Sequence, residues 1–152
     1  MTVQEVMSAA PATCRQDTDL AAVAKLMWDH DCGFIPVVGD AGTVVGVVTD
    51  RDICIATATR RLLPEHISAA QAMTGPVHAC PPTDKTSEAL ATMKQFRIRR
   101  LAVIDADGHL QGVISINDIV LASHQKRGPA AQEIVSAMAA ICAHRSVIPA
   151  LA

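Results

Sequence analysis

The chain is poor in aromatic residues: among its 152 residues it has no tyrosine, one tryptophan and two phenylalanines. Half of its residues are nevertheless hydrophobic, so the core must be built from aliphatic side chains and methionine. The chain also lacks a run of about 18 apolar residues that could span a membrane, and no basic start followed by an apolar stretch marks a secretory signal. These absences predict a cytoplasmic protein with no membrane partner.

Neither sign of charge is in clear excess, because 13 basic residues face 15 acidic ones and the net charge is −2. A general nucleic-acid-binding protein usually carries a strong basic excess. The balance therefore predicts no nucleic-acid partner, and it also argues against electrostatic docking on an anionic membrane.

Paired metal ligands and catalytic groups are missing as well. The five cysteines form no CxxC pair, and the six histidines show no ligand-like spacing. No glycine-rich phosphate loop, nucleophile with its base, or pair of catalytic carboxylates stands out. We therefore expect no disulfide framework, no metal site, no cofactor and no enzymatic activity.

An internal duplication is the main positive feature of the sequence. "GVVTDRDI" at Gly46–Ile53 returns as "GVISINDI" at Gly112–Ile119, 66 positions later. The same offset aligns further identical pairs without gaps: Met7 with Met73, Cys14 with Cys80, Met27 with Met93, Val37 with Val103 and Gly42 with Gly108. The duplication predicts a first repeat at 1–61, a second repeat with its connector at 62–127, and a helical tail at 128–152.

Both repeats show the same order of hydrophobic periodicities. A helix at about 18–30 is predicted by apolar residues at spacings of three and four, which form a buried face of Leu20, Val23, Ala24, Met27 and Trp28. A short strand at 12–14 precedes this helix. A hairpin of two strands, at 34–38 and 43–49, and a second helix at 50–61 follow it. The second repeat gives the same elements at 77–80, 87–96, 101–104, 110–115 and 117–125. The fold class is α+β, with two β-α-β-β-α repeats packed in pseudo-two-fold symmetry plus a C-terminal helix.

The segments "GFIPVVGDAGTVVGVVTDRDI" and "RRLAVIDADGHLQGVISINDI" resemble the signature of the cystathionine-β-synthase (CBS) domain pair, the regulatory Bateman module. The resemblance covers about residues 1–125. It implies a cleft between the repeats that binds an adenine nucleotide such as AMP, ADP or ATP, with S-adenosylmethionine or a dinucleotide as other ligands known in the family. It also implies a homodimer, because such modules commonly associate in pairs.

The resemblance places the nucleotide where the second hairpin strand of each repeat passes into the last helix. There Asp52 and Asp118 are spaced to accept both ribose hydroxyls, and Thr49 and Ser115 can donate to a phosphate beside free helical N–H groups. The remaining residues that the resemblance assigns to binding are Arg51, Arg99, Arg100 and Asn117 beside the phosphates and ribose, and Thr13, Ile35, Val77, His78 and Leu101 near the base.

The repeats differ in charge at the start of their first hairpin strand. Arg99 and Arg100 of the second repeat correspond to the uncharged Gly33 and Phe34 of the first. The planar guanidinium group suits phosphate oxygens, so the second repeat is expected to bind phosphate better.

Simpler interpretations of these residues stay open. Asp52 and Asp118 are also typical helix-capping residues, and both roles can hold at once. The arginines near position 99 can equally form a solvated surface cluster.

The tail contains a last predicted helix, Gly128–Ser146, which has no counterpart in the first repeat and has Pro129 at its start. It carries one apolar stripe of Ile134, Val135, Met138, Ile141 and Cys142. The stripe either packs on its own module or contacts a partner, and both alternatives stay open.

These features predict a stand-alone regulatory module that binds an adenine nucleotide and signals its occupancy to a separate effector protein. The alternative is a protein-interaction or dimerisation scaffold whose ligand sites have degenerated.

Overall fold

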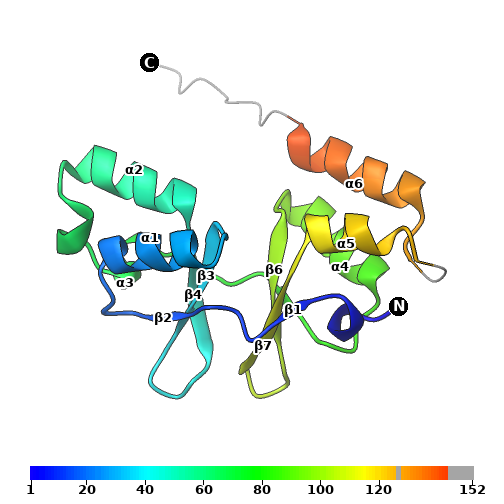
Figure 1. Ribbon diagram of the computed structural model, residues 1–152, viewed down its shortest axis with the longest axis horizontal. Coiled ribbons are helices and arrows are strands. Elements are labelled where there is room, and N and C mark those ends of the chain that lie inside the picture. The colour runs from blue at the N-terminus through cyan, green and yellow to red at the C-terminus, as the bar shows by residue number, and fades with distance from the viewer. Residues whose placement is uncertain (126–127, 144–152) are drawn as a thin grey trace.

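Two similar halves lie side by side, each with a small sheet toward the middle of the molecule and helices on the outside (Figure 1). The structure is a computed structural model that describes residues 1–125 and 128–143. It confirms the predicted α+β class and the duplicated order of elements. No helix of these described ranges is long and apolar enough to cross a membrane.

The first half is built on the three-stranded sheet β2-β3-β4. Its elements are β2 (Cys14–Arg15), α1 (Leu20–Asp29), β3 (Phe34–Val38), β4 (Val44–Thr49) and α2 (Asp50–Arg60). The second half repeats this order in β5 (Ala79–Cys80), α4 (Thr86–Phe96), β6 (Arg100–Ile104), β7 (Leu110–Ser115) and α5 (Ile116–Ala122). The turns of the two hairpins meet, because the Val44 amide donates a hydrogen bond of 3.1 Å to the Gly108 carbonyl.

Helix α1 differs from its prediction at both its start and its buried face. Asp19 caps the helix, with the Ala22 amide donating to its carboxylate at 2.9 Å, so the helix begins later than expected. The predicted burial of Ala24 and Trp28 is wrong, since both are exposed and Trp28 keeps 87% of its surface accessible. The sheet covers only the narrower stripe of Leu20, Val23 and Met27, and the two exposed residues flank that stripe.

The halves exchange their N-terminal segments. The 3-10 turn η1 (Val3–Glu5) and strand β1 (Ser8–Ala9) join the second half, where β1 pairs with β7. The Val3 amide donates to the Asp84 carbonyl at 2.8 Å, and its side chain is buried in the core of that half. Each half is therefore completed by the segment that precedes the other repeat.

The connector at the start of the second repeat takes the corresponding place in the first half. It contains η2 (Pro64–His66) and α3 (Ala69–Ala72), and Ile67 and Ala69 are buried in the core of that half. The Ala69 amide donates to the Thr18 carbonyl at 2.7 Å. This segment is thus a structural part of the first half as well as a link between repeats.

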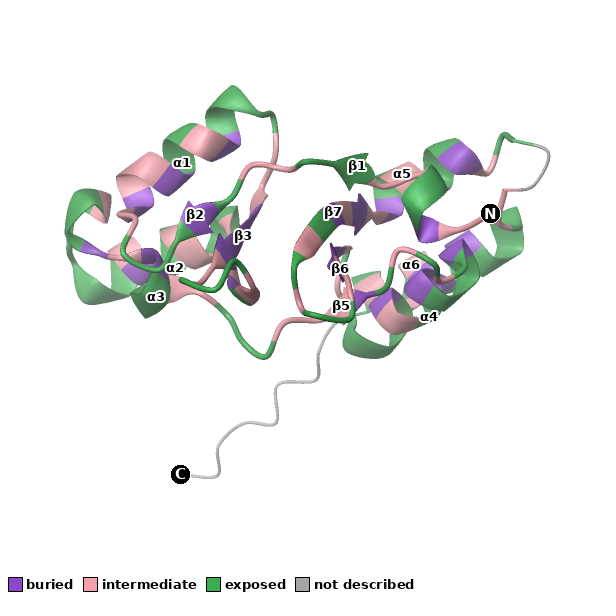
Figure 2. Ribbon diagram, turned by 90° about the horizontal axis from the view of Figure 1, so that it is seen from below, coloured by how far each residue is buried: buried purple, intermediate pink, exposed green. Residues whose placement is uncertain are grey.

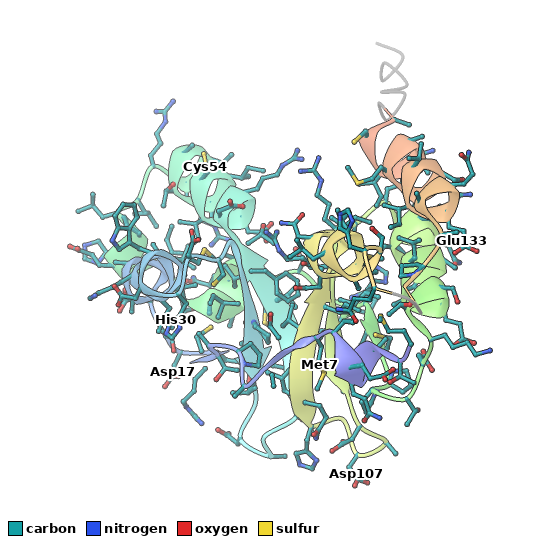
Figure 3. The ribbon with its side chains drawn as sticks, turned by 45° about the vertical axis from the view of Figure 1, so that its right-hand side comes forward. Met7, Asp17, His30, Cys54, Asp107 and Glu133 are labelled. Atoms are coloured by element: carbon teal, nitrogen blue, oxygen red, sulfur yellow. The ribbon has the colours of Figure 1, made fainter. Side chains whose placement is uncertain are left out.

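Two glycines make room for the exchanged segments. A Cβ atom on Gly46 would lie 2.5 Å from the Met73 sulfur, and one on Gly112 would lie 2.6 Å from the Met7 sulfur. Met7 lies between the N-terminal turn and β7 (Figure 3). The repeated glycine–methionine pairs at an offset of 66 therefore mark the two crossing points.

The last described helix, α6 (Ala131–Cys142), packs against α4 and α5 of the second half. Its apolar stripe is buried in part: Ile134 and Ala137 are buried, and Met138 and Ile141 pack beside them. Val135 and Cys142 are exposed, so only part of the predicted apolar stripe packs on its own module. The predicted end of this helix, near position 146, lies outside the described residues. Buried residues elsewhere gather on the strands and on the helix faces turned toward them (Figure 2).

Candidate functional site

The two predicted strand–helix junctions have the same hydrogen-bonding pattern. At the start of α2, the Thr49 amide and hydroxyl both donate to one Asp52 carboxylate oxygen, at 2.8 and 2.7 Å. At the start of α5, the Ser115 amide and hydroxyl donate to Asp118 at 2.7 and 2.6 Å. In return the Asp amide donates to the hydroxyl oxygen, at 3.2 Å in both halves. Each junction is a reciprocal capping box, which bears out the capping interpretation.

The capping box limits what each junction can offer a ligand. The single hydroxyl hydrogen of Thr49 or Ser115 points to the aspartate, so donation to a phosphate would require that bond to break. Only one oxygen of each aspartate takes part in the box, and the second oxygen of this half-buried group can still accept ribose hydroxyls. Capping and ligand binding are therefore compatible for Asp52 and Asp118.

The residue opposite each hydroxyl sets the charge of the junction. In the antiparallel pair of β6 and β7, Arg100 lies directly across from Ser115. In β3 and β4, Phe34 lies across from Thr49. Directly opposed side chains lie about 5 Å apart at Cβ and share one face of the sheet. The second half therefore combines a guanidinium group, a hydroxyl and a carboxylate, whereas the first half has a phenyl ring at the corresponding position.

Three arginines lie near the junctions. Among the described residues, the guanidinium groups of Arg51, Arg99 and Arg100 form no hydrogen bond or ion pair. Arg99 and Arg51 are exposed, while Arg100 is half-buried. Arg100 lines a cavity of about 620 Å³ whose other walls belong to the first half.

The residues expected near the base fall into two groups. The side chains of Ile35 and Leu101 are fully buried in the two cores, so they can offer a ligand only their backbone. Thr13 is exposed and Val77 is half-buried, at the edges of the short strands. The His78 ring stacks on Phe96 with centroids 4.0 Å apart, which gives the second half a small aromatic surface.

Asp50 supplies the first half with a second carboxylate near the junction, in addition to Asp52. The sequence analysis did not identify Asp50 as part of the site. A Cβ atom on Gly33 would lie 2.8 Å from an Asp50 carboxylate oxygen, so this acidic group lies directly over the start of β3. The offset of 66 pairs Asp50 with the buried Ile116, and Gly33 with Arg99. Comparing the repeats position by position for charge, rather than for identity, would have found it.

One acidic cluster lies at the tip of the second hairpin. Ligand atoms of Asp105, Asp107 and His109 all lie within 4.8 Å of one another, a geometry that could hold a cation. The Asp105 carboxylate, however, accepts the amides of His109 and Asp107 at 2.9 and 3.0 Å and the Gln111 side chain at 2.8 Å. The His109 amide, as the main cause, and these other bonds lower the pKa of Asp105. The cluster is accounted for as a turn.

Two equivalent cysteines line the cores and not the junctions. Cys14 and Cys80 are 5% and 3% exposed, and burial raises the pKa of each thiol to about 11. Both are therefore neutral thiols at physiological pH.

Comparison with known proteins identifies the two halves. A family model of the CBS domain matches residues 3–58 and 68–125, so the chain belongs to the CBS domain family and contains a pair of these domains. The chain is 29% identical over 118 residues to hypoxic response protein 1 of Mycobacterium tuberculosis, which covers 78% of this chain and 82% of that protein. It is 32% identical over 110 residues to inosine-5′-monophosphate dehydrogenase of the same species. That match covers 72% of this chain but only 20% of the enzyme.

Solved structures agree with the family assignment. A CBS domain protein of unknown function from Thermoplasma acidophilum superposes with a TM-score of 0.79 at 20% identity, over 92% of this chain and 75% of that one. The CBS domain pair of protein MJ0100, in complex with 5′-methylthioadenosine and S-adenosyl-L-methionine, superposes with a TM-score of 0.72 at 22% identity. That match covers 80% of this chain and 98% of the MJ0100 chain. CBSX2 in complex with AMP superposes with a TM-score of 0.70 at 23% identity, over 82% of this chain and 96% of the CBSX2 chain. At these identities the likeness shows the shared fold.

Proposed function

We propose that this protein is a regulatory CBS pair, not an enzyme, that binds an adenine nucleotide of the AMP, ADP or ATP type and signals its occupancy to a separate effector protein. The MJ0100 and CBSX2 complexes support the ligand class, because each of their ligands carries adenine on a ribose ring. S-adenosylmethionine and dinucleotides share this group and remain competitors in the test. A homodimer in the cytoplasm belongs to the same proposal.

The observation that carries the proposal is the grouping of Arg100, Ser115 and Asp118 at one strand–helix junction. Arg100 supplies an unpaired positive charge for a phosphate, and the second oxygen of Asp118 can accept ribose hydroxyls. Hydrogen bonds to charged groups contribute about 1.5–3 kcal/mol each. The half-buried position of Arg100 reduces solvent screening of that charge relative to the exposed Arg99.

The first half is the weaker phosphate site in this proposal. Phe34 replaces the arginine opposite the hydroxyl, and Asp50 adds a negative charge at the start of β3. A phosphate there would meet the carboxylates of Asp50 and Asp52 together, and the exposed Arg51 is the nearest cation in sequence.

Thermal melting against AMP, ADP, ATP, NAD and S-adenosylmethionine tests the proposal. At about one hundred times its dissociation constant, a ligand should stabilise the fold by about 2.7 kcal/mol, which raises the melting temperature by roughly 5–10 °C. The rise should be lost in Arg100→Ala and kept in Arg99→Ala, the matched loss of one charge beside the site. No rise with any of the five ligands would contradict nucleotide binding and favour the interaction scaffold.

A further inference from the structure

A groove between α1 and α2 has no covering element in the described part of the chain. It is the cavity of about 620 Å³ introduced above, and its floor and walls include Ala24, Met27, Trp28, Cys32, Ile53 and Cys54. Asp31, Asp50 and Arg100 stand among the lining residues as the charged groups. The 87% exposure of Trp28 leaves a large apolar side chain in water beside this groove.

The internal duplication shows what covers the corresponding surface of the second half. The offset of 66 carries Met27 and Ile53 to Met93 and Ile119, and helix α6 lies over that surface. Met93 and Ile119 are both 0% exposed and share one core cluster with Ile134 and Ala137 of α6. In the first half, Met27 keeps 7% exposure and Ile53 is half-buried.

Residue size favours a wider hollow in the first half. Three of its lining residues, Ala24, Cys32 and Cys54, replace larger residues of the second half. Those counterparts are Leu90, Ile98 and Val120. A helix that docks on the first half would therefore find a hollow wide enough for its own apolar side chains.

Corresponding positions around the two grooves differ in charge. Around the covered surface, Lys94 donates to Ser136 of α6 at 2.9 Å and lines a small cavity together with Glu133. Glu133 lies on α6 beside α4 (Figure 3). Lys94 and Arg97 of the second half correspond to Trp28 and Asp31 of the first, and the buried Ile116 corresponds to Asp50.

We propose that the α1–α2 groove binds an amphipathic helix of a partner protein, with a stripe of small apolar residues and flanking lysines or arginines. The apolar stripe would fill the groove and cover Trp28, as α6 does for the second half. Basic flanks would complement Asp31 and Asp50. Helix α6 of a second copy fits less well, because Glu133 is its one charged residue over Ala131–Cys142.

The test uses Trp28, the chain's single tryptophan, as reporter in the 152-residue chain. The probe is a capped synthetic peptide of about 14 residues, with alanine and leucine in one helical stripe and lysines at its edges. A matched probe has glutamate in place of each lysine. We expect a saturable blue shift of Trp28 emission with the basic probe, and roughly tenfold weaker binding of the acidic probe.

Two variants locate the binding. Ala24→Leu/Cys54→Val introduces the corresponding side chains of the second half at two exposed positions. The variant should bind the basic probe at least about tenfold more weakly, with an unchanged melting temperature. Asp31→Asn should reduce the difference in affinity between the basic and the acidic probe. Asparagine tolerates the positive φ of 47° at this position. The matched control is Asp107→Asn at the far hairpin tip (Figure 3), which should change nothing.

Three results would overturn the proposal. The first is no emission shift with the basic probe, and the second is equal binding of both probes. The third is an emission shift that grows with protein concentration in the absence of a probe, which would assign the groove to a second copy of the chain. None of these results depends on whether the protein binds a nucleotide.

Discussion

Arg100 on β6 lies directly across from Ser115 on β7, one residue before the helix that Asp118 caps. The same arginine lines the groove of the opposite half. It is thus a cation without an internal partner among the described residues, placed between a candidate phosphate site and a candidate docking site. This position makes Arg100 the residue through which the two sites can influence each other.

Coupling between the two sites has a predicted sign. A phosphate that attracts Arg100 would leave Asp31 and Asp50 as the charges of the groove, so it should strengthen binding of a basic helix. We expect saturating AMP to lower the dissociation constant of the basic probe by about threefold to tenfold, measured by Trp28 emission. In Arg100→Ala the effect of AMP should disappear. An unchanged or raised dissociation constant in the wild-type protein would refute this coupling.

Removal of a capping carboxylate should cost stability even without a ligand. Asp118→Ala loses the acceptor for both the Ser115 amide and its hydroxyl, and we expect a loss of about 1 kcal/mol in the free energy of unfolding. Asp118→Asn keeps an acceptor oxygen and should lose less. Urea denaturation of both variants measures the difference, and equal losses would show that the hydrogen-bond acceptor is unimportant.

The two crossing points should differ in their tolerance of a methyl group. At Gly112 an added Cβ would lie 2.9 Å from the Ser8 carbonyl as well as against Met7, whereas at Gly46 its near neighbours all belong to the flexible Met73 side chain. Gly112→Ala should therefore cost about 1–3 kcal/mol of folding free energy, and Gly46→Ala less. Chemical denaturation measures both, and the reverse order would contradict the packing described here.

Four of the five cysteines should separate into a reactive and a protected pair. Burial raises the pKa of Cys14 and Cys80 to about 11 from an ordinary value of 9.0, whereas Cys54 and Cys142 are exposed. At pH 8, iodoacetamide should label Cys54 and Cys142 within the native protein and reach Cys14 and Cys80 only after unfolding, as read by peptide mass spectrometry. Rapid native labelling of Cys14 would contradict its buried position.

The same pKa shifts give a direction for alkaline stability. The folded state favours the neutral thiol, so the stabilisation is complete below pH 9 and is lost as the pH rises toward about 11. A Cys14→Ala/Cys80→Ala variant should show a smaller fall in the free energy of unfolding over this range than the wild type.

Sequence periodicity predicted the repeated elements well because each strand and helix buries one regular face. The prediction failed at Trp28, because the hydrophobicity of a residue does not reveal whether a neighbouring helix covers it. In the second half α6 provides that cover, and in the first half none of the described elements does. The exposure of Val135 has the same cause, because the apolar stripe of α6 does not reveal which of its members its own module covers.

The two strand–helix junctions could be located from the sequence, but their geometry could not. The recurring hydroxyl and aspartate identified both junctions, yet their hydrogen bonds to each other emerged only with the backbone in place. The exchange of N-terminal segments was also hidden, because the linear order assigns Met7 and Met73 to the repeats that follow them. Long-range pairing of this kind leaves no local periodicity for the sequence to reveal.

The most direct test of the central claim is a calorimetric titration of AMP into the wild-type protein and into Arg100→Ala. We predict saturable binding with about one strong site per chain, and a loss of roughly tenfold to a hundredfold in affinity in the variant, as expected for a lost bond to a charged group. Equal affinity of the two proteins would contradict the assigned site. If AMP gives no binding heat with the wild-type protein, and equilibrium dialysis also detects no bound AMP, nucleotide binding itself would be contradicted.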